Sequence, residues 1–120
     1  MRAFGMKIHA INRRGASDEP TDWIARADRI DEMLRVADVL VISAALTTAT
    51  EGLIGARELD LMKENAILIN VARGEIVDEA ALYAHLVAHP HFSPASTRGG
   101  LSRCCTAASR WVTRFSTCRT

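Results

Sequence analysis

The stretch that most constrains the fold runs from residue 66 to residue 79, AILINVARGEIVDE. Residues 66–71 form a short apolar run rich in Ile, which is typical of a buried strand in a parallel sheet. Arg73 follows at the expected carboxyl end of this strand, the edge at which open α/β sheets bind ligands. Asp78 has the form of an N-cap for a helix over residues 79–88. The stretch predicts a strand, a turn that presents a guanidinium and a capped helix; a merely solvated Arg73 is an equal alternative.

The length and composition limit the class of protein. A chain of 120 residues forms one domain at most, and its 48% hydrophobic and 24% charged residues are ordinary for a globular protein. The net charge of +1 gives no reason to expect nucleic acid or an anionic membrane as a partner. No apolar run approaches the roughly 20 residues that span a bilayer, and the N-terminus has no secretory signal pattern. We therefore expect a cytoplasmic protein.

The last part of the chain differs from the rest. Residues 93–120 hold five Arg, five Ser and five Thr, whereas all fourteen acidic residues precede them. The three cysteines, Cys104, Cys105 and Cys118, also lie there, without the spacing of a zinc site. We read His9, inside a predicted strand, as a structural residue, and we predict no metal site.

The remaining pattern alternates strands and helices. Residues 7–12 and 39–44 read as two further strands, and residues 30–36 and 56–62 as helices. Three strands separated by helices, each strand ending in a polar turn, predict a doubly wound parallel α/β sheet. This pattern would also suit a receiver-like domain or part of a phosphotransferase.

Polar side chains occupy the turns at the ends of the two earlier strands. Asn12, Arg13 and Arg14 form either a solvated turn or a contact to phosphate or ribose, because arginine pairs well with phosphate. Thr47 and Thr50 follow the strand at 39–44, where they either bind a ligand or cap the next turn.

Three motifs in order, FGMKIHAINRRG, ADVLVISAALTTATEGLI and LMKENAILINVARGEIVDEAAL, cover most of residues 1–92. In this order and spacing the chain resembles the nucleotide-binding domain of the D-isomer-specific 2-hydroxyacid dehydrogenases. The resemblance implies a Rossmann-like enzyme that transfers hydride between a nicotinamide cofactor and a small 2-hydroxy or 2-oxo acid. It also implies a homodimer formed through this domain.

The resemblance assigns roles to individual residues. It gives Arg73 the catalytic role of holding the substrate carboxylate and polarising its carbonyl, which suits a planar, permanently charged guanidinium. It also implies that the cofactor is lined by two groups of residues at strand ends, Ala45, Leu46 and Thr47 together with Val71 and Ala72. Ala45 stands where the family often has proline.

Cofactor choice depends on the first turn. Asn12 falls where NAD-preferring members commonly carry an aspartate that binds the ribose hydroxyls. An acid there would repel a 2′-phosphate, whereas Asn12 followed by Arg13 and Arg14 would accept one. The cofactor is therefore NAD or NADP, with a lean to NADP.

Two departures from the family pattern put activity in doubt. The family's first strand and glycine-rich pyrophosphate loop are not among the 120 residues, and that strand belongs between the strands at 7–12 and 39–44. The glutamate and histidine that move the proton are not recognisable either, since His89 and His91 come too early. We expect a partial sheet that is inactive as given, or a non-catalytic remnant that binds cofactor or dimerises.

Residues 93–120 suggest their own origin. A consistent choice of synonymous codons, read in another frame from the codon of Phe92, gives LAGIDAWWVEPLLHGGESLGDPVLDLPN. This string resembles the family's next strand and its glutamate-bearing segment. We therefore interpret residues 93–120 as a frame-shifted translation; a genuine disordered or anion-binding tail is the alternative.

Overall fold

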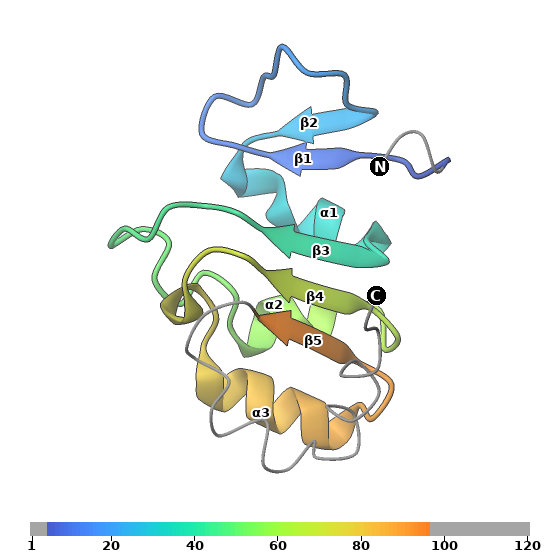
Figure 1. Ribbon diagram of the computed structural model, residues 1–120, viewed down its shortest axis with the longest axis vertical. Coiled ribbons are helices and arrows are strands. Elements are labelled where there is room, and N and C mark those ends of the chain that lie inside the picture. The colour runs from blue at the N-terminus through green and yellow to red at the C-terminus, as the bar shows by residue number, and fades with distance from the viewer. Residues whose placement is uncertain (1–4, 97–120) are drawn as a thin grey trace, which may run out of the picture.

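A computed structural model describes residues 5–96, which form two parallel sheets with three α-helices (Figure 1). The smaller sheet pairs β1 (His9–Ile11) with β2 (Trp23–Ala25). The larger sheet has the order β3-β4-β5, with β3 (Val39–Ile42), β4 (Ile67–Asn70) and β5 (Ser93–Ser96). The predicted α/β class and parallel sheet are confirmed.

The helices connect the strands as a parallel sheet requires. They are α1 (Ile30–Val36), α2 (Ala56–Leu61) and α3 (Glu79–Ala88), within a residue or two of the predicted ranges. Short 3-10 turns precede α1 at Ala27–Arg29 and α3 at Gly74–Ile76. None of the helices in the described part of the chain is long and apolar enough to cross a membrane.

Two strands were not predicted. The short β2 was missed because its three residues, between a polar loop and a helical turn, are too few to show a period. β5 occupies Ser93–Ser96, inside the segment that we expected to be a tail, so the ordered part extends at least to Ser96. Pro94 is tolerated because β5 is the edge strand, where a missing N–H costs little. Residues 97–120 lie outside the described residues.

The core lies between the larger sheet and its helices. Alternate residues of β3 and β4, Leu40 and Ile42 on β3 and Leu68 and Asn70 on β4, are buried on the face that the helices cover. Burying such a Leu or Ile side chain stabilises the fold by roughly 1.5–3 kcal/mol. The largest fully buried side chains of this core are Leu34, Ile54, Leu59, Leu68 and Ile76.

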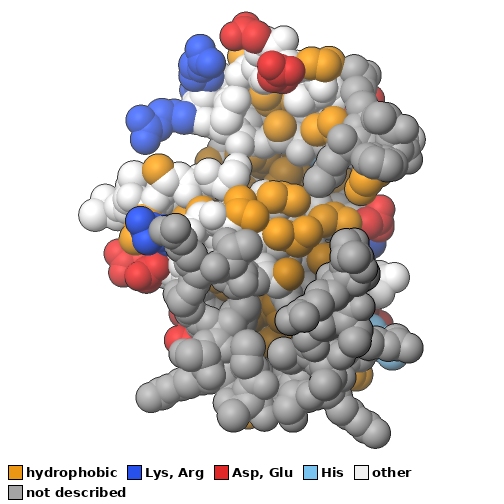
Figure 2. Space-filling model, viewed as in Figure 1, with side chains coloured by type: hydrophobic (Ala, Val, Ile, Leu, Met, Phe, Trp, Pro, Cys, Tyr) orange, Lys and Arg blue, Asp and Glu red, His pale blue; other side chains and the backbone are white. Residues whose placement is uncertain are grey.

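The opposite face of the sheet carries apolar side chains that the helices leave open. Val41 is 43% exposed and Ile67 is 40% exposed, and Figure 2 shows hydrophobic side chains gathered over β3 and β4 on this face. The sequence predicted strands buried on both faces. The structure corrects this: β3 and β4 are buried on one face only.

The two sheets lie next to each other without being joined. Figure 1 shows β1 facing β3, and the two strands belong to separate hydrogen-bonded sheets. This is the position that the resemblance assigns to the family's first strand. A strand's unpaired N–H and C=O groups are a template for pairing with another strand.

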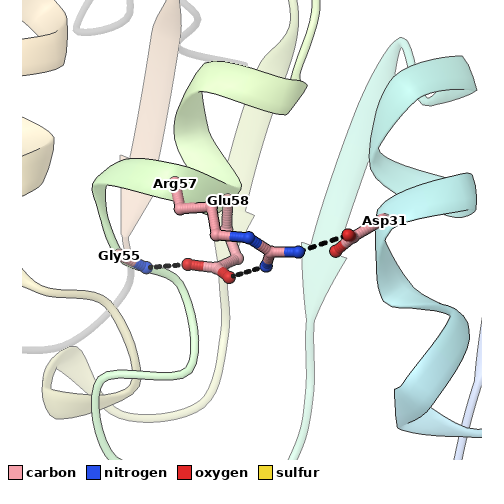
Figure 3. A network of polar contacts seen from close by, with 4 residues as sticks. All are labelled: Asp31, Gly55, Arg57 and Glu58. Atoms are coloured by element: carbon pink, nitrogen blue, oxygen red, sulfur yellow. Dashed lines mark hydrogen bonds and ion pairs between the residues drawn. The ribbon is translucent and has the colours of Figure 1, made fainter.

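A polar network on the helical layer ties α1 to α2. Arg57 donates hydrogen bonds to Glu58, at 2.7 Å, and to Asp31 on α1, while the Glu58 carboxylate accepts the Gly55 N–H at 3.1 Å (Figure 3). Because the Arg57 side chain is 65% exposed, water screens both ion pairs. The network therefore fixes the orientation of α2 relative to α1 and adds little to the free energy of unfolding.

The N-cap of α3 gives a direct stability prediction. The Asp78 carboxylate accepts the Ala81 N–H at 2.8 Å, as the sequence predicted. We expect Asp78→Ala to lower the free energy of unfolding by about 1 kcal/mol, because an N–H of the first turn loses its acceptor. Urea denaturation of the two proteins measures this, with Asp78→Asn as the control that keeps a capping oxygen. An equal loss in both variants would show that the cap is not the cause.

Candidate functional site

Asn70, the last residue of β4, shapes the turn that carries Arg73. Its buried side-chain amide donates to the Arg73 carbonyl oxygen at 2.8 Å, and its own oxygen accepts the Ala72 N–H at 3.0 Å. These two bonds fix the backbone over residues 70–73, while the Arg73 side chain is exposed. Within residues 5–96 no carboxylate pairs with its guanidinium. The turn therefore holds the backbone of Arg73 in place and leaves its guanidinium accessible to an anionic ligand.

The loop after β3 is closed by a hydroxyl. Thr50 Oγ1 donates to the Ala45 carbonyl oxygen at 2.7 Å and accepts the Thr47 N–H at 2.8 Å. The sequence left open whether Thr50 binds a ligand or caps the turn, and the structure shows that its hydroxyl bonds the backbone of its own loop. Ala45, Leu46 and Thr47 are all exposed on this loop.

The loop after β1 is held by Asn12. Its side-chain nitrogen donates to the Ala16 carbonyl oxygen at 2.8 Å, and its oxygen accepts the Gly15 N–H at 2.7 Å. Gly15 has a φ of +69°, and an added Cβ would lie 2.9 Å from Arg26 Cγ, so only glycine fits this turn. Asn12 therefore shapes the loop, and Arg13 and Arg14 are its exposed cations.

The three loops lie on the same side of the molecule, at the edge where their strands end (Figure 1). The arrowheads of β1, β3 and β4 point the same way, and the three loops leave from that side of the molecule (Figure 1). The edge thus carries Arg13 and Arg14, the exposed loop at 45–47, and Arg73 with its neighbours Val71 and Ala72. Of these neighbours Val71 is exposed and Ala72 is partly buried. Such an edge, with three arginines, suits an anionic ligand.

A shallow hollow of about 470 Å³ lies beside this edge but has the opposite charge. Four carboxylate side chains line it, so it would repel a phosphate or a substrate carboxylate. We therefore do not place the cofactor there. The lining residues are Glu51, Gly52, Gly74, Glu75, Val77, Asp78 and Glu79.

Comparison with known proteins identifies the fold's relatives. The sequence profile described as "D-isomer specific 2-hydroxyacid dehydrogenase, NAD binding domain" matches residues 1–92. The chain belongs to the D-isomer-specific 2-hydroxyacid dehydrogenase family. The resemblance seen in the three motifs is thereby confirmed.

The relatives are longer proteins. 4-Methyl-2-oxopentanoate reductase A of Aspergillus oryzae is 41% identical over 85 residues, which are 71% of this chain and 26% of the relative. Glyoxylate reductase of Thermococcus gammatolerans is 40% identical over 81 residues, 68% of this chain and 24% of the relative. The crystal structure of D-lactate dehydrogenase with NAD+ from Lactobacillus jensenii matches with a TM-score of 0.64 and 36% identity, covering 78% of this chain and 28% of that one. The chain thus spans about a quarter of the length of these relatives.

A second cluster lies away from the arginine edge and was missed in the sequence. His85 on α3 is buried, its Nδ1 lies 3.5 Å from Asp60 Oδ1 on α2, and its ring centroid lies 4.3 Å from that of His89. The four-residue spacing of the two histidines on one helix was an available signal; the contribution of Asp60 needed the packing of α2 on α3. Burial, and secondarily His89, lowers the pKa of His85, and Asp60 opposes this.

The Asn70 turn yields a second prediction. We expect Asn70→Ala to lower the free energy of unfolding by about 1–3 kcal/mol, because the turn loses two hydrogen bonds in a buried place. Amide exchange at residues 72–74 should accelerate more than exchange in α1. Urea denaturation and NMR exchange measure the two effects, with the exposed Asn65→Ala on the preceding loop as the matched control. Unchanged exchange at residues 72–74 would contradict the clamp.

The His85 environment gives a pH dependence. Because the folded pKa of His85 lies below the unfolded value of about 6.5, the unfolded chain binds the proton first. The contribution of His85 to the free energy of unfolding is therefore fully present above a pH of about 6.5 and is lost as the pH falls below it. We expect His85→Leu to show a weaker loss between about pH 7 and pH 5.5 than the unmodified chain.

Urea unfolding over this pH range measures the difference between the two proteins. The exposed His91→Ala is the control, and it should keep the full pH dependence. Asp60 and His89, which face His85, are unchanged in both variants. Parallel pH profiles for His85→Leu and the unmodified chain would contradict the assignment.

Proposed function

We propose that these residues form part of the cofactor domain of an oxidoreductase that transfers hydride between NAD(P) and a small 2-hydroxy or 2-oxo acid. The observation that carries the proposal is the Arg73 turn, an exposed guanidinium on a backbone fixed by Asn70 at the carboxyl end of a parallel strand. The names of the relatives, which include a glyoxylate reductase, agree with such a substrate. The substrate carboxylate would pair with the guanidinium through two hydrogen bonds.

The residues present fit a nicotinamide dinucleotide in part. The cofactor, when bound, supplies the hydride. The exposed loop at 45–47 and the Val71–Ala72 backbone would line it, and Arg13 and Arg14 would pair with a 2′-phosphate. The side-chain nitrogen and oxygen of Asn12 already bond Ala16 and Gly15, so this side chain has little hydrogen-bonding capacity left for a ribose hydroxyl. These two arginines are the reason for the lean towards NADP over NAD.

Arg73 would contribute to the reaction through its charge. A guanidinium beside the carbonyl oxygen of a 2-oxo acid stabilises the negative charge that develops there when hydride reaches the carbonyl carbon. The proton that the oxygen then requires must come from an acid, and in the family a histidine supported by a glutamate provides it. The resemblance finds no counterpart of that pair in this sequence, so we propose that the 120-residue chain does not turn over by itself.

We also propose that residues 93–120 are read in a shifted frame and that the family's glutamate is encoded but not translated. The formation of β5 is compatible with this origin. The strand pairs through backbone groups, which any residue except proline offers at every position.

A second candidate is a non-catalytic remnant that binds cofactor or associates with another copy. The open apolar face favours it, because Val41 and Ile67 lie exposed on paired strands. A patch of this kind is typical of an interaction surface. This candidate predicts a dimer by light scattering without any oxidation of NADH or NADPH.

Titration of the ¹⁵N-labelled chain with glyoxylate tests the proposed role of Arg73. We expect shifts of the Arg73 Nε–H and of the amides of Ala72 and Gly74, because the carboxylate pairs with the guanidinium at this turn. Arg73→Ala should abolish the shifts, whereas Arg35→Ala, an exposed arginine on α1, should leave them unchanged. Shifts confined to other parts of the chain would contradict the role of Arg73.

The same titration with NADPH and NADH separates the cofactors, since NADPH alone should perturb Arg13 and Arg14. Equal perturbation by both would contradict the lean to NADP. An assay of NAD(P)H oxidation with glyoxylate completes the test. Turnover by the chain alone would overturn the proposed inactivity and support the family reaction.

A further inference from the structure

Three side chains with metal-binding atoms meet where α2 packs on α3. Asp60 comes from α2, and His85 and His89 come from α3. One ligand atom from each can be chosen so that all three atoms lie within 4.8 Å of one another. We propose that Asp60, His85 and His89 form a binding site for a divalent transition-metal ion of the zinc class.

Helix geometry explains the pairing of the two histidines. Residues four positions apart on an α-helix lie above one another on the same face, and His89 is the C-cap residue that ends α3. Their ring centroids are 4.3 Å apart, with an angle of 32° between the planes. Two imidazoles are therefore already side by side before any ion binds.

The state of His85 is the observation that points to a ligand. Both ring nitrogens are buried and have no hydrogen-bond partner among the described residues. A buried polar atom without a partner is destabilising, so native proteins rarely leave one. An edge-on contact with Phe92, at 4.8 Å between centroids, closes one side of the ring with carbon rather than with an acceptor. A cation at Nδ1 would satisfy the nitrogen that faces Asp60.

The distance between His85 and Asp60 fits an ion better than a hydrogen bond. The Nδ1 to Oδ1 separation is 3.5 Å, longer than a good hydrogen bond between these atoms. With bonds of about 2.0–2.2 Å, two ligands of a tetrahedral zinc ion lie about 3.3–3.6 Å apart. A ring nitrogen of the partly buried His89 lies within 4.8 Å of a ligand atom of each of the other two residues.

The donor set selects the class of ion. Two imidazoles and one carboxylate suit zinc, and nickel or copper after it, whereas calcium and magnesium require oxygen ligands. The Asp60 side chain is 72% exposed, so water can occupy the fourth position. The bound ion would link α2, through Asp60, to α3, through the two histidines.

The site is independent of the proposed oxidoreductase function. α3 runs from the edge that carries Arg73 to the opposite edge of the sheet, and both histidines lie towards its far end (Figure 1). Failure of the glyoxylate titration would therefore leave this inference intact, and the reverse also holds.

Zinc titration of the full chain tests the site. The three cysteines are replaced by serine in every sample, because free thiolates would also bind zinc. We expect uptake of one zinc ion per chain by calorimetry and a rise in Tm that a chelator reverses. Long-range NMR correlations of the histidine rings should show the ¹⁵N signals of His85 and His89 shifting, while those of His9 and His91 stay in place.

Two surface variants localise the binding without disturbing the core. Asp60→Ala and His89→Ala should each raise the Kd for zinc at least about tenfold, since each removes one of three ligands. His91→Ala is the matched control and should bind as the parent does, with circular dichroism confirming that all variants fold. The proposal is overturned if neither variant weakens binding, if the signals of His9 or His91 shift instead, or if the parent takes up no zinc at about 1 mM.

Discussion

The parallel pairing of β4 with a strand on each side is the constraint on which the rest of the structure depends. Leu68 and Asn70 pair with Leu40 and Ile42 on β3 and with the backbone of β5. Parallel pairing places the carboxyl ends of the strands at one edge, so the loops after β3 and β4 become neighbours although residues 51–70 separate them along the chain. The same pairing aligns one apolar face for α1 and α2.

The Asn70 turn shows how packing and function share one residue. Its amide is buried because it ends a core strand, and it satisfies the Arg73 carbonyl and the Ala72 N–H. The guanidinium is thereby carried on a fixed backbone, as a site that orients a small acid requires. Asn12 and Thr50 fix the other two loops by the same means, with side-chain hydrogen bonds to nearby backbone.

The elements with a clear apolar period were predictable, and α1 and α3 match their expected ranges because their spacing and the Asp78 cap are local signals. Short elements were not. β2 has three residues, and β5 is a proline-containing edge strand paired with β4. The meeting of Asp60 with His85 arises from a tertiary contact between α2 and α3 that no single stretch encodes. The hydrogen bonds of Asn12 and Asn70 are local, to backbone groups two to four residues away, and the tendency of asparagine to form such turns was the signal that could have indicated them. Arg73 was located by strand order, whereas its partner molecule remains a proposal.

The central proposal is that Arg73 belongs to the substrate site of a 2-hydroxyacid dehydrogenase. The nucleotide sequence of the gene, extended to both sides, tests it most directly. We expect a glycine-rich loop and a strand upstream, and AWWVEP downstream of the Phe92 codon in another frame. Unrelated flanks, together with codons over residues 93–120 that do not permit this reading, would contradict the claim and favour the non-catalytic remnant.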